Sequence, residues 1–271
     1  MLTINFATMK KIKIYQVDAF TDKLFSGNPA AVCILEDWIS DELMQSIGME
    51  NNLAETAFVV PMGDKYGIRW FTPTVEVDLC GHATLAAGYI LLKYYNTDSS
   101  MVTFNSHRSG DLMVFRQDEK YFLDFPADTF TPVDEKDRIS SYINCRTIEL
   151  YKGKTDYLAV IESEKELRSI KPDLIQISTL KARGLIVTAQ GDSVDFVSRF
   201  FAPQSGIDED PVTGSAHTTL IPLWSEKLGK TNLSAIQLSK RGGQLTCINR
   251  GSRCWIGGEL KLFMEGEIIV D

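Results

Sequence analysis

One glutamate in this sequence is a candidate acid or base. Glu55 comes directly before Thr56 and the apolar, strand-like run Ala57–Val60. A carboxylate where a strand begins can take or return a proton if the surrounding chain buries it. In most proteins an acidic residue at such a position is simply solvated. Position alone therefore leaves both interpretations of Glu55 open.

Further polar groups precede two apolar, helix-like segments. Cys80, Gly81 and His82 lead into Ala83–Leu92, and the run Asp210–Ser215 leads into Ala216–Leu228. We expect helices that begin at Gly81 and Gly214 and point free N–H groups and a positive dipole end at the preceding loop. Such ends can hold a carboxylate or stabilise an enolate. Asp210 and Thr213 are equally typical of ordinary helix caps, with Ser215 on the first turn.

The histidines and cysteines form no recognisable metal motif. In the first turn of its helix, His82 should have a lowered pKa, which favours a neutral imidazole suited to proton relay, although a lone histidine in a turn is often structural. His107 and His217 are distant from it in the chain, and the five cysteines contain no CxxC pair. We expect no metal site and reduced thiols.

Nucleotide-cofactor motifs are absent from the sequence as well. No GxGxxG run follows a strand, and Gly229-Lys230-Thr231 has Trp224 where a phosphate-binding loop requires its earlier glycine. We interpret Gly229 as the end of a helix. The sequence therefore predicts no cofactor.

A repeat organises the chain. Arg69-Trp70-Phe71-Thr72-Pro73 is echoed by Arg199-Phe200-Phe201-Ala202-Pro203, each at the end of an alternating, strand-like run. A β-branched run precedes each copy, Thr56–Val60 in the first and Leu185–Thr188 in the second. The order strand, strand, loop, helix thus recurs over about 35 residues, which favours duplication over two unrelated strand–turn–helix units.

Short strand-like runs surround the two repeats and predict a strand-rich α+β fold. Ser40–Met49 is a predicted helix with Ser40 as its N-cap. A length of 271 residues allows one large or two ordinary domains. The other predicted strands are Lys11–Phe20, Ala30–Leu35, Val102–Phe104, Leu112–Arg116, Tyr121–Phe125, Asp156–Ile161, Ile236–Leu238, Gln244–Ile248, Arg253–Ile256 and Leu260–Phe263.

Charge and hydropathy exclude some partners. A net charge of -8 argues against nucleic acid and anionic membranes, and an acidic substrate would need a locally positive pocket. The longest apolar stretch, Ala83–Leu92, is much shorter than the roughly 20 residues that span a bilayer. Met1–Lys10 lacks the order of a signal peptide, and Met9 is an alternative start, so we expect a cytoplasmic protein without membrane contact.

Six blocks, in the same order along the chain, together resemble the PhzF-like family of phenazine biosynthesis. The resemblance covers roughly residues 11–271 and is specific. One departure is Ala54, where the family often has serine before the glutamate. The blocks are Gln16–Thr21, Gly27–Val32, Asn52–Phe58, Asp78–Thr84, Asp208–His217 and Ser239–Gly243.

The resemblance implies a diaminopimelate-epimerase-like fold, in which two similar halves, each a curled mixed sheet around a central helix, are related by a pseudo-two-fold axis. We place the N-terminal half at residues 1–114, with 262–271 as a candidate addition, and the C-terminal half at 115–261. The active site is expected in a cleft between them, and a homodimer is common. The family pattern makes Glu55 the acid or base, assisted by His82, Asp210 and Ser215. Substrate would be held near Gly81, Gly214, Cys80 and Thr213.

The resemblance also separates two kinds of enzyme. Relatives on this fold racemise amino acids with two cysteines, one before the glycine of each half. Here Cys80 fills the first position and Thr213 the second, and an alcohol cannot replace a thiolate at neutral pH. A single carboxylate instead suits a proton shift, for which burial should raise the pKa of Glu55.

The sequence therefore predicts a cofactor-independent isomerase that moves a proton or double bond in a small carboxylate-bearing metabolite. One alternative is a racemase or epimerase that uses Glu55 with Cys80. The other is a non-catalytic metabolite-binding or interaction protein on the same scaffold, because a fold does not guarantee turnover.

Overall fold

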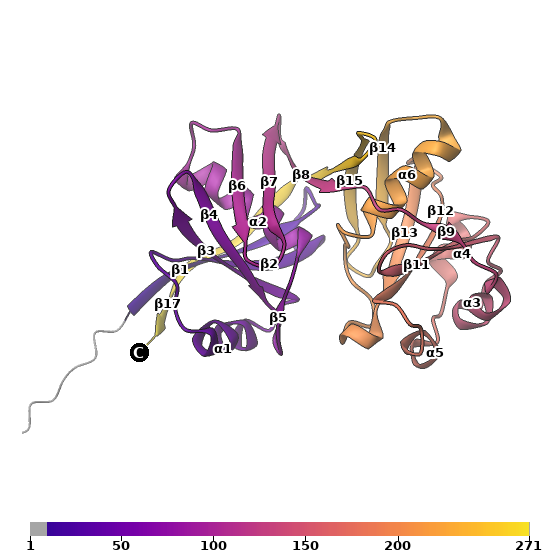
Figure 1. The fold of residues 1–271 in the computed structure, drawn as a ribbon, viewed down its shortest axis with the longest axis horizontal. Helices are drawn as coiled ribbons and strands as arrows, with labels where there is room; N and C mark the ends of the chain where they lie inside the picture. The colour runs from indigo at the N-terminus through magenta and orange to yellow at the C-terminus, as the bar shows by residue number, and fades with distance from the viewer. Residues whose placement is uncertain (1–9, 271) are drawn as a thin grey trace, which may run out of the picture.

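The computed structural model describes residues 10–270, which form two lobes of mixed α and β structure side by side (Figure 1). The first lobe holds α1 and α2, and the second holds α3 to α6. The helices are α1 (Asp41–Asn51), α2 (Gly81–Ile90), the π-helix η1 (Leu91–Tyr95), α3 (Lys136–Ile143), α4 (Glu164–Ser169), α5 (Leu174–Ser178), the 3-10 helix η2 (Pro203–Ser205) and α6 (His217–Leu228).

Seventeen strands are present in the described residues. They are β1 (Lys10–Ala19), β2 (Asn28–Ile34), β3 (Glu55–Met62), β4 (Lys65–Phe71), β5 (Glu76–Val77), β6 (Met101–Ser106), β7 (Gly110–Gln117), β8 (Lys120–Pro126), β9 (Thr131–Pro132), β10 (Glu149–Lys152), β11 (Asp156–Val160), β12 (Gly184–Gln190), β13 (Phe196–Phe201), β14 (Asn232–Gln237), β15 (Gly243–Asn249), β16 (Arg253–Gly258) and β17 (Leu260–Val270).

The two lobes share one order of strand pairing, which confirms the predicted α+β class with two similar halves. In the first lobe three pairs of strands are antiparallel, parallel and antiparallel, namely β1–β2, β2–β3 and β3–β4. The next three are parallel, antiparallel and antiparallel, namely β4–β6, β6–β7 and β7–β8. In the second, β10–β11, β11–β12, β12–β13, β13–β14, β14–β15 and β15–β16 follow the same order. The repeat seen in the sequence is therefore a structural repeat.

Each lobe is built around one apolar helix. Every residue of α2 from His82 to Ile90 is buried, so this helix is surrounded by its sheet rather than lying on it. In α6 seven of the twelve residues are buried. A helix that is apolar on almost all sides belongs in a core. Sheets around α2 and α6 therefore bring the starts of both helices to defined places.

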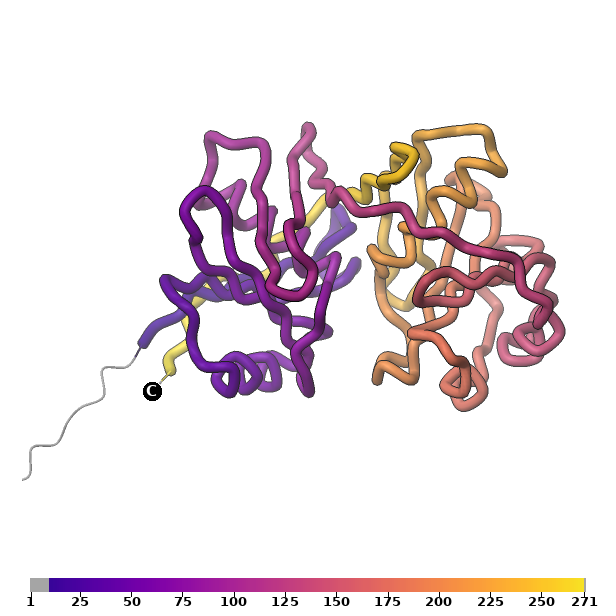
Figure 2. Tube along the Cα trace, in the orientation of Figure 1, coloured from indigo at the N-terminus to yellow at the C-terminus, as the bar shows by residue number. Residues whose placement is uncertain are grey.

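Two connections join the lobes. The tube in Figure 2 leaves the first lobe in the magenta stretch and returns in the yellow one. There, β8 pairs with β16, and the chain then re-enters the first lobe as β17, which pairs with β1. The predicted boundary between residues 114 and 115 lies within β7. Residues 262–270 belong to β17, which pairs with β1, and Asp271 lies outside the described residues.

Several helices begin or end at the capping residues that the sequence predicted. Ser40 caps α1 by accepting a hydrogen bond from the Leu43 amide at 3.2 Å. α2 begins at Gly81, as predicted, and α6 ends at Gly229 in the left-handed conformation. Short elements such as α3, α5 and β9 were not predicted, because segments this short carry too little periodicity.

The predicted start of the second helix at Gly214 was wrong. Residues 214–216 form a tight turn, and α6 begins at His217. The amides of His217 and Thr218 bond to the carbonyls three residues earlier, so the turn is wound more tightly than an α-helix. Ser215 therefore lies before the helix, and no side chain caps α6, which also contradicts the capping interpretation of Asp210 and Thr213.

Candidate active site

The structure brings Glu55, His82 and Asp210 into one buried cluster. Glu55 is the first residue of β3 and His82 is the second residue of α2, and their atoms Oε2 and Nε2 lie 3.3 Å apart without hydrogen-bond alignment. Asp210 reaches the cluster from the second lobe through Asn28, whose amide donates to Asp210 Oδ1 at 2.9 Å. Residues separated by more than 100 positions in the chain thus meet where the lobes join.

Asn28 links the two lobes beside His82. Its Nδ2 atom has two hydrogens and three nearby acceptors: Val212 O at 2.8 Å, Asp210 Oδ1 at 2.9 Å and His82 Nδ1 at 3.2 Å. The two oxygens are nearer and take both hydrogens. Asn28 therefore joins Asp210 and the Val212 carbonyl of the second lobe to His82 of the first, while Nε2 of the same ring faces Glu55.

A second amide side chain holds the loop of the second lobe. Gln237 accepts from the Thr213 amide at 2.9 Å and donates to Asp210 O at 2.8 Å. The hydroxyl of Thr213 donates to Asp210 Oδ2 at 2.5 Å. Both oxygens of Asp210 thus have donors, so this carboxylate is held in one orientation.

The two predicted glycines face each other across the junction. A Cβ added to Gly81 would lie 3.7 Å from Gly214 Cα, and one added to Gly214 would lie 3.9 Å from Gly81 Cα. The first amides of α2 have no partner within the helix, as in any helix start. Among the described residues no acceptor meets the amides of Gly214 and Ser215. Backbone donors from both lobes therefore converge on one place, where an anion could bind.

Ser215 is held by an arginine that the sequence did not reveal. Arg183, at the end of the loop before β12, donates from Nη1 to Ser215 Oγ at 2.7 Å. The same guanidinium forms two hydrogen bonds to Asp156, at 3.0 and 2.5 Å, and lies 5.1 Å from the centre of the Phe200 ring. With its oxygen occupied as an acceptor, the Ser215 hydroxyl is free to donate to a ligand.

Burial shifts the pKa values of the acidic groups and the imidazole. The pKa of Glu55 is raised to about 7 by burial and by the charge of Asp210. Burial also raises the pKa of Asp210 to about 6, against the lowering effect of its hydrogen bonds from Thr213 and Asn28. The pKa of His82 falls to about 4, and burial rather than the helix dipole is the cause. At neutral pH His82 is therefore a neutral base beside a carboxyl group that exchanges its proton readily.

Cys80 lies beside these groups on the first lobe. Its sulfur is 3.5 Å from His82 Nδ1, and burial together with the charge of Glu55 raises its pKa well above the usual value. The thiol is therefore protonated at neutral pH. One donor atom each from Glu55, Cys80 and His82 lies within 4.8 Å of the others. The sequence did not reveal that Glu55, Cys80 and His82 lie together, because only the spacing between the three histidines was compared.

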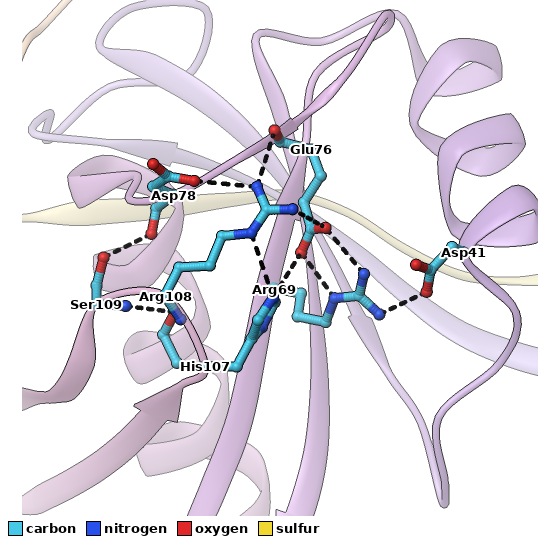
Figure 3. A network of polar contacts seen from close by, with 8 residues as sticks. Asp41, Arg69, Glu76, Asp78, His107, Arg108 and Ser109 are labelled. Atoms are coloured by element: carbon cyan, nitrogen blue, oxygen red, sulfur yellow. Dashed lines mark hydrogen bonds and ion pairs between the residues drawn. The ribbon is translucent and has the colours of Figure 1, made fainter.

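An ion-pair network in the first lobe holds the segment that leads to Cys80 (Figure 3). Arg69 on β4 binds both oxygens of Glu76, at 2.7 and 2.9 Å. Arg108 on the turn between β6 and β7 binds Glu76 and Asp78, and the Ser109 hydroxyl donates to the Asp78 carbonyl at 2.6 Å. Contacts at both ends of the segment fix where α2 begins, three residues after Asp78.

The cluster is enclosed in this structure. The side chains of Glu55 and His82 are 12% and 6% exposed. Cavities of about 820 and 400 Å³ lie elsewhere, the first beside Tyr89 and Lys93 and the second beside Trp38 and Arg69, and no residue of the cluster lines them. Neither of these two cavities is therefore the place where a substrate would meet Glu55.

The predicted site residues thus lie together. Glu55, His82, Cys80 and Gly81 come from the first lobe, and Asp210, Thr213, Gly214 and Ser215 come from the second. Asn28, Arg183 and Gln237 were missed. The sequence analysis placed Asn28 in a turn, Gly27–Pro29. Its complete burial distinguishes it from an ordinary turn residue, and this burial is known from the structure and not from the sequence.

Comparison with known proteins identifies the family. Residues 17–266 match the PhzC-PhzF family, described as phenazine biosynthesis-like protein. The chain belongs to the PhzF family. An uncharacterised isomerase of Pseudomonas aeruginosa is 48% identical over 258 residues, which cover 95% of this chain and 98% of that protein. The predicted isomerase of the PhzF family is confirmed at this level.

Solved structures agree with the family and with the predicted fold. A PhzF-family structure from Enterococcus faecalis matches with a TM-score of 0.93 and 46% identity, over 96% of this chain and 99% of that one. A hydroxyproline epimerase from Agrobacterium vitis matches with a TM-score of 0.58 and 12% identity, over 97% and 92%. The second likeness shows the shared diaminopimelate-epimerase-like fold alone. In residues 10–270 no helix is both long and apolar enough to span a bilayer.

Proposed function

We propose that this PhzF-family protein is a cofactor-independent isomerase that uses Glu55 to move a proton, and with it a double bond, in a small carboxylate-bearing metabolite. The observation that carries the proposal is the Glu55 carboxyl group, buried where the lobes join and with a pKa raised to about 7. An acid–base group works best when its pKa lies near the working pH.

The proposed reaction needs one carboxylate. Ionised Glu55 removes a proton from a substrate carbon next to a conjugated carbonyl or carboxylate, and the electron pair of the broken C–H bond enters the conjugated system. Protonated Glu55 then delivers the same proton to another carbon, and the electron pair returns to form the new C–H bond. The imidazole of His82, with Nε2 3.3 Å from Glu55 Oε2, lies close enough to orient the carboxyl group as it takes and returns the proton.

Groups around the junction supply the charge complement. Free amides at Gly214 and Ser215 and the start of α2 suit an anionic group on the substrate. Arg183 holds Ser215 in place through one hydrogen bond, while Asp156 balances the charge of its guanidinium. The donors for an acidic substrate are therefore the backbone amides and the Ser215 hydroxyl.

Hydrogen exchange in D₂O tests the proposal. The purified protein is mixed with trans-2,3-dihydro-3-hydroxyanthranilate and a panel of cyclic and amino-acid carboxylates, and loss of carbon-bound protons is followed by NMR. We expect exchange or isomerisation of at least one compound, and its loss in Glu55→Gln.

The matched control is Glu50→Gln, the same change at an exposed glutamate outside the cluster. This control should exchange like the parent protein. If Glu55→Gln exchanges as fast as the parent, Glu55 is not the base. If neither protein exchanges any member of the panel, the proposed substrate class is wrong.

The racemase alternative is favoured by one observation, the protonated Cys80 thiol beside Glu55. A protonated thiol could supply the returning proton in place of Glu55. This alternative predicts that Cys80→Ala abolishes product formation while Glu55 still exchanges the substrate proton. The single-carboxylate isomerase predicts that Cys80→Ala retains both.

A further inference from the structure

We infer that Glu55, Cys80 and His82 form a binding site for a thiophilic divalent cation such as Zn²⁺, and that the bound ion blocks the acid–base site. The binding is independent of the reaction, whereas the block rests on the proposed function of Glu55. The inference concerns control of the site rather than its chemistry.

The types of donor atom match those that Zn²⁺ selects. A thiolate, an imidazole nitrogen and a carboxylate oxygen are its usual protein ligands, and a site with three of them keeps one position open. Here each residue contributes one such atom, all within 4.8 Å of one another. Mg²⁺ and Ca²⁺ prefer oxygen ligands and should not bind.

The spacing is close to that of a tetrahedral site. Bonds of about 2.0–2.3 Å place tetrahedral ligands roughly 3.3–3.8 Å apart. Glu55 Oε2 and His82 Nε2 already lie 3.3 Å apart. The Cys80 sulfur lies 3.5 Å from Nδ1, the other ring nitrogen, so binding of the ion through Nε2 needs a rotation of the Cys80 side chain.

Two of the donor atoms are buried without a partner. Glu55 Oε2 and His82 Nε2 have no hydrogen bond in the structure, although both are inaccessible to solvent. Buried polar atoms are nearly always paired, so two unpaired atoms directed at each other point to a missing third partner. A metal ion would satisfy both at once.

The charge of the cluster also favours a cation. Glu55, Cys80 and Asp210 are three acidic groups in one buried place, and among residues 10–270 no Lys or Arg side chain forms an ion pair with any of them. Binding of Zn²⁺ displaces the thiol proton of Cys80, and that of Glu55 where it is protonated, into solvent. The affinity should therefore rise with pH.

Metal titration of the folded protein tests the inference. Protein freed of metal with EDTA and then desalted is titrated with Zn²⁺ against a chromophoric chelator, and with Co²⁺ while the near-ultraviolet thiolate band is recorded. We expect one ion per chain, a thiolate band, and no response to Mg²⁺. Cys80→Ala and Cys80→Ser should each weaken Zn²⁺ binding at least tenfold and remove the band.

The chain offers a matched control in Cys145, whose sulfur lies 3.8 Å from Glu166 Oε2 with no histidine in the pair. Cys145→Ala should bind Zn²⁺ like the parent protein, and thermal melting confirms that each variant is folded. Absence of binding in the parent, or unchanged affinity and an unchanged band in both Cys80 variants, would overturn the inference.

Inhibition is measured separately on the exchange reaction. Zn²⁺ should abolish hydrogen exchange with the midpoint found in the titration, and EDTA should restore it. If Glu55→Gln removes exchange but saturating Zn²⁺ leaves it intact, the block is refuted while the proposed function stands. If no substrate is found, the titration alone still decides whether the ion site exists.

Discussion

The two lobes share a scaffold but divide the polar groups of the site unequally. In the first, Arg69 binds both oxygens of Glu76 and its guanidinium lies 5.2 Å from the Phe71 ring. In the second, Arg199 binds both oxygens of Glu209 and lies 4.9 Å from the Phe201 ring. The same arginine–glutamate ion pair, with the arginine over a phenylalanine ring, therefore occurs on the corresponding strand of both lobes. The acid–base groups, in contrast, differ between the lobes.

Strand register shows which residues correspond. Ala57 pairs with Trp70 in the first lobe, and Ile186 pairs with Phe200 in the second. Counting back two residues matches Glu55 with Gly184, and counting back three matches Ala54 with Arg183. The first lobe thus supplies a carboxylate where the second has only hydrogen, and the second supplies a cation where the first has a methyl group.

The difference has a steric cause. A Cβ added to Gly184 would lie 2.5 Å from Phe200 Cζ and 2.8 Å from the Phe201 carbonyl oxygen, closer than atoms can approach. No side chain fits at this place without displacing the neighbouring strand. The second lobe therefore cannot offer a second carboxylate at the matching position, which favours a reaction with one acid–base group.

The largest expected effect separates the two lobes directly. Glu55→Gln should slow hydrogen exchange by about 10³-fold, because general acid–base groups contribute on the order of 10²–10⁴. Ser215→Ala should cost only about tenfold, because the hydroxyl contributes one hydrogen bond. Rates of deuterium uptake at saturating substrate measure both. If the two variants lost the same share of the exchange rate, groups of both lobes would take part in the proton transfer.

Stability against pH tests the raised pKa of Glu55. A carboxyl group with a folded-state pKa of about 7 and an ordinary value of 4.5 binds more protons in the folded than in the unfolded protein between these values. The free energy of unfolding should therefore fall as pH rises from 4.5 to 7, by at most about 3 kcal/mol. Urea unfolding at several pH values should show this fall in the parent protein and a smaller one in Glu55→Gln.

Gly184→Ala should destabilise the second lobe. The added methyl group collides with the Phe200 ring, and overpacking of this kind costs about 1–3 kcal/mol. The matched control is Gly266→Ala on β17, where an added Cβ meets no atom within 4 Å. Thermal melting should show a lower transition for Gly184→Ala than for the control. Similar transitions would mean that the space at Gly184 does not restrict the second lobe.

The smallest expected effect concerns Arg183. Lysine at this position keeps the charge but cannot bind Asp156 with two bonds and Ser215 with a third, so kcat should fall by about tenfold, or about 1.4 kcal/mol. The pH profile should keep its midpoint, because the charge remains. Arg168→Lys, at an arginine that pairs only with Glu164, is the control. An unchanged kcat would remove Arg183 from the site.

The sequence predicted what local patterns determine. The apolar run after Gly81 predicted a central helix, and the echo of Arg69–Pro73 at Arg199–Pro203 predicted two similar halves. The resemblance predicted that Glu55, His82 and Asp210 belong to one site. These features depend on residue types in a fixed order, which a sequence displays directly.

The remaining features depend on distances between remote parts of the chain. Asn28 and Asp210 are joined by a hydrogen bond across 182 positions, and nothing near either residue indicates the other. The tight turn before α6 was missed because Gly214, Ser215 and Ala216 are also compatible with a helix start. Arg183 appeared to be one more charged loop residue until the structure placed Ser215 beside it.

Isotope transfer within one turnover tests the central claim most directly. A substrate found by the exchange screen, deuterated at the carbon that Glu55 is proposed to attack, is converted in H₂O with enzyme in excess and quenched after a single turnover. If a single carboxylate acts, part of the deuterium should appear at the new position in the product. Glu55→Gln should form no product and transfer no deuterium. Product whose new hydrogen comes entirely from solvent, together with loss of activity in Cys80→Ala, would contradict the account and require a second acid.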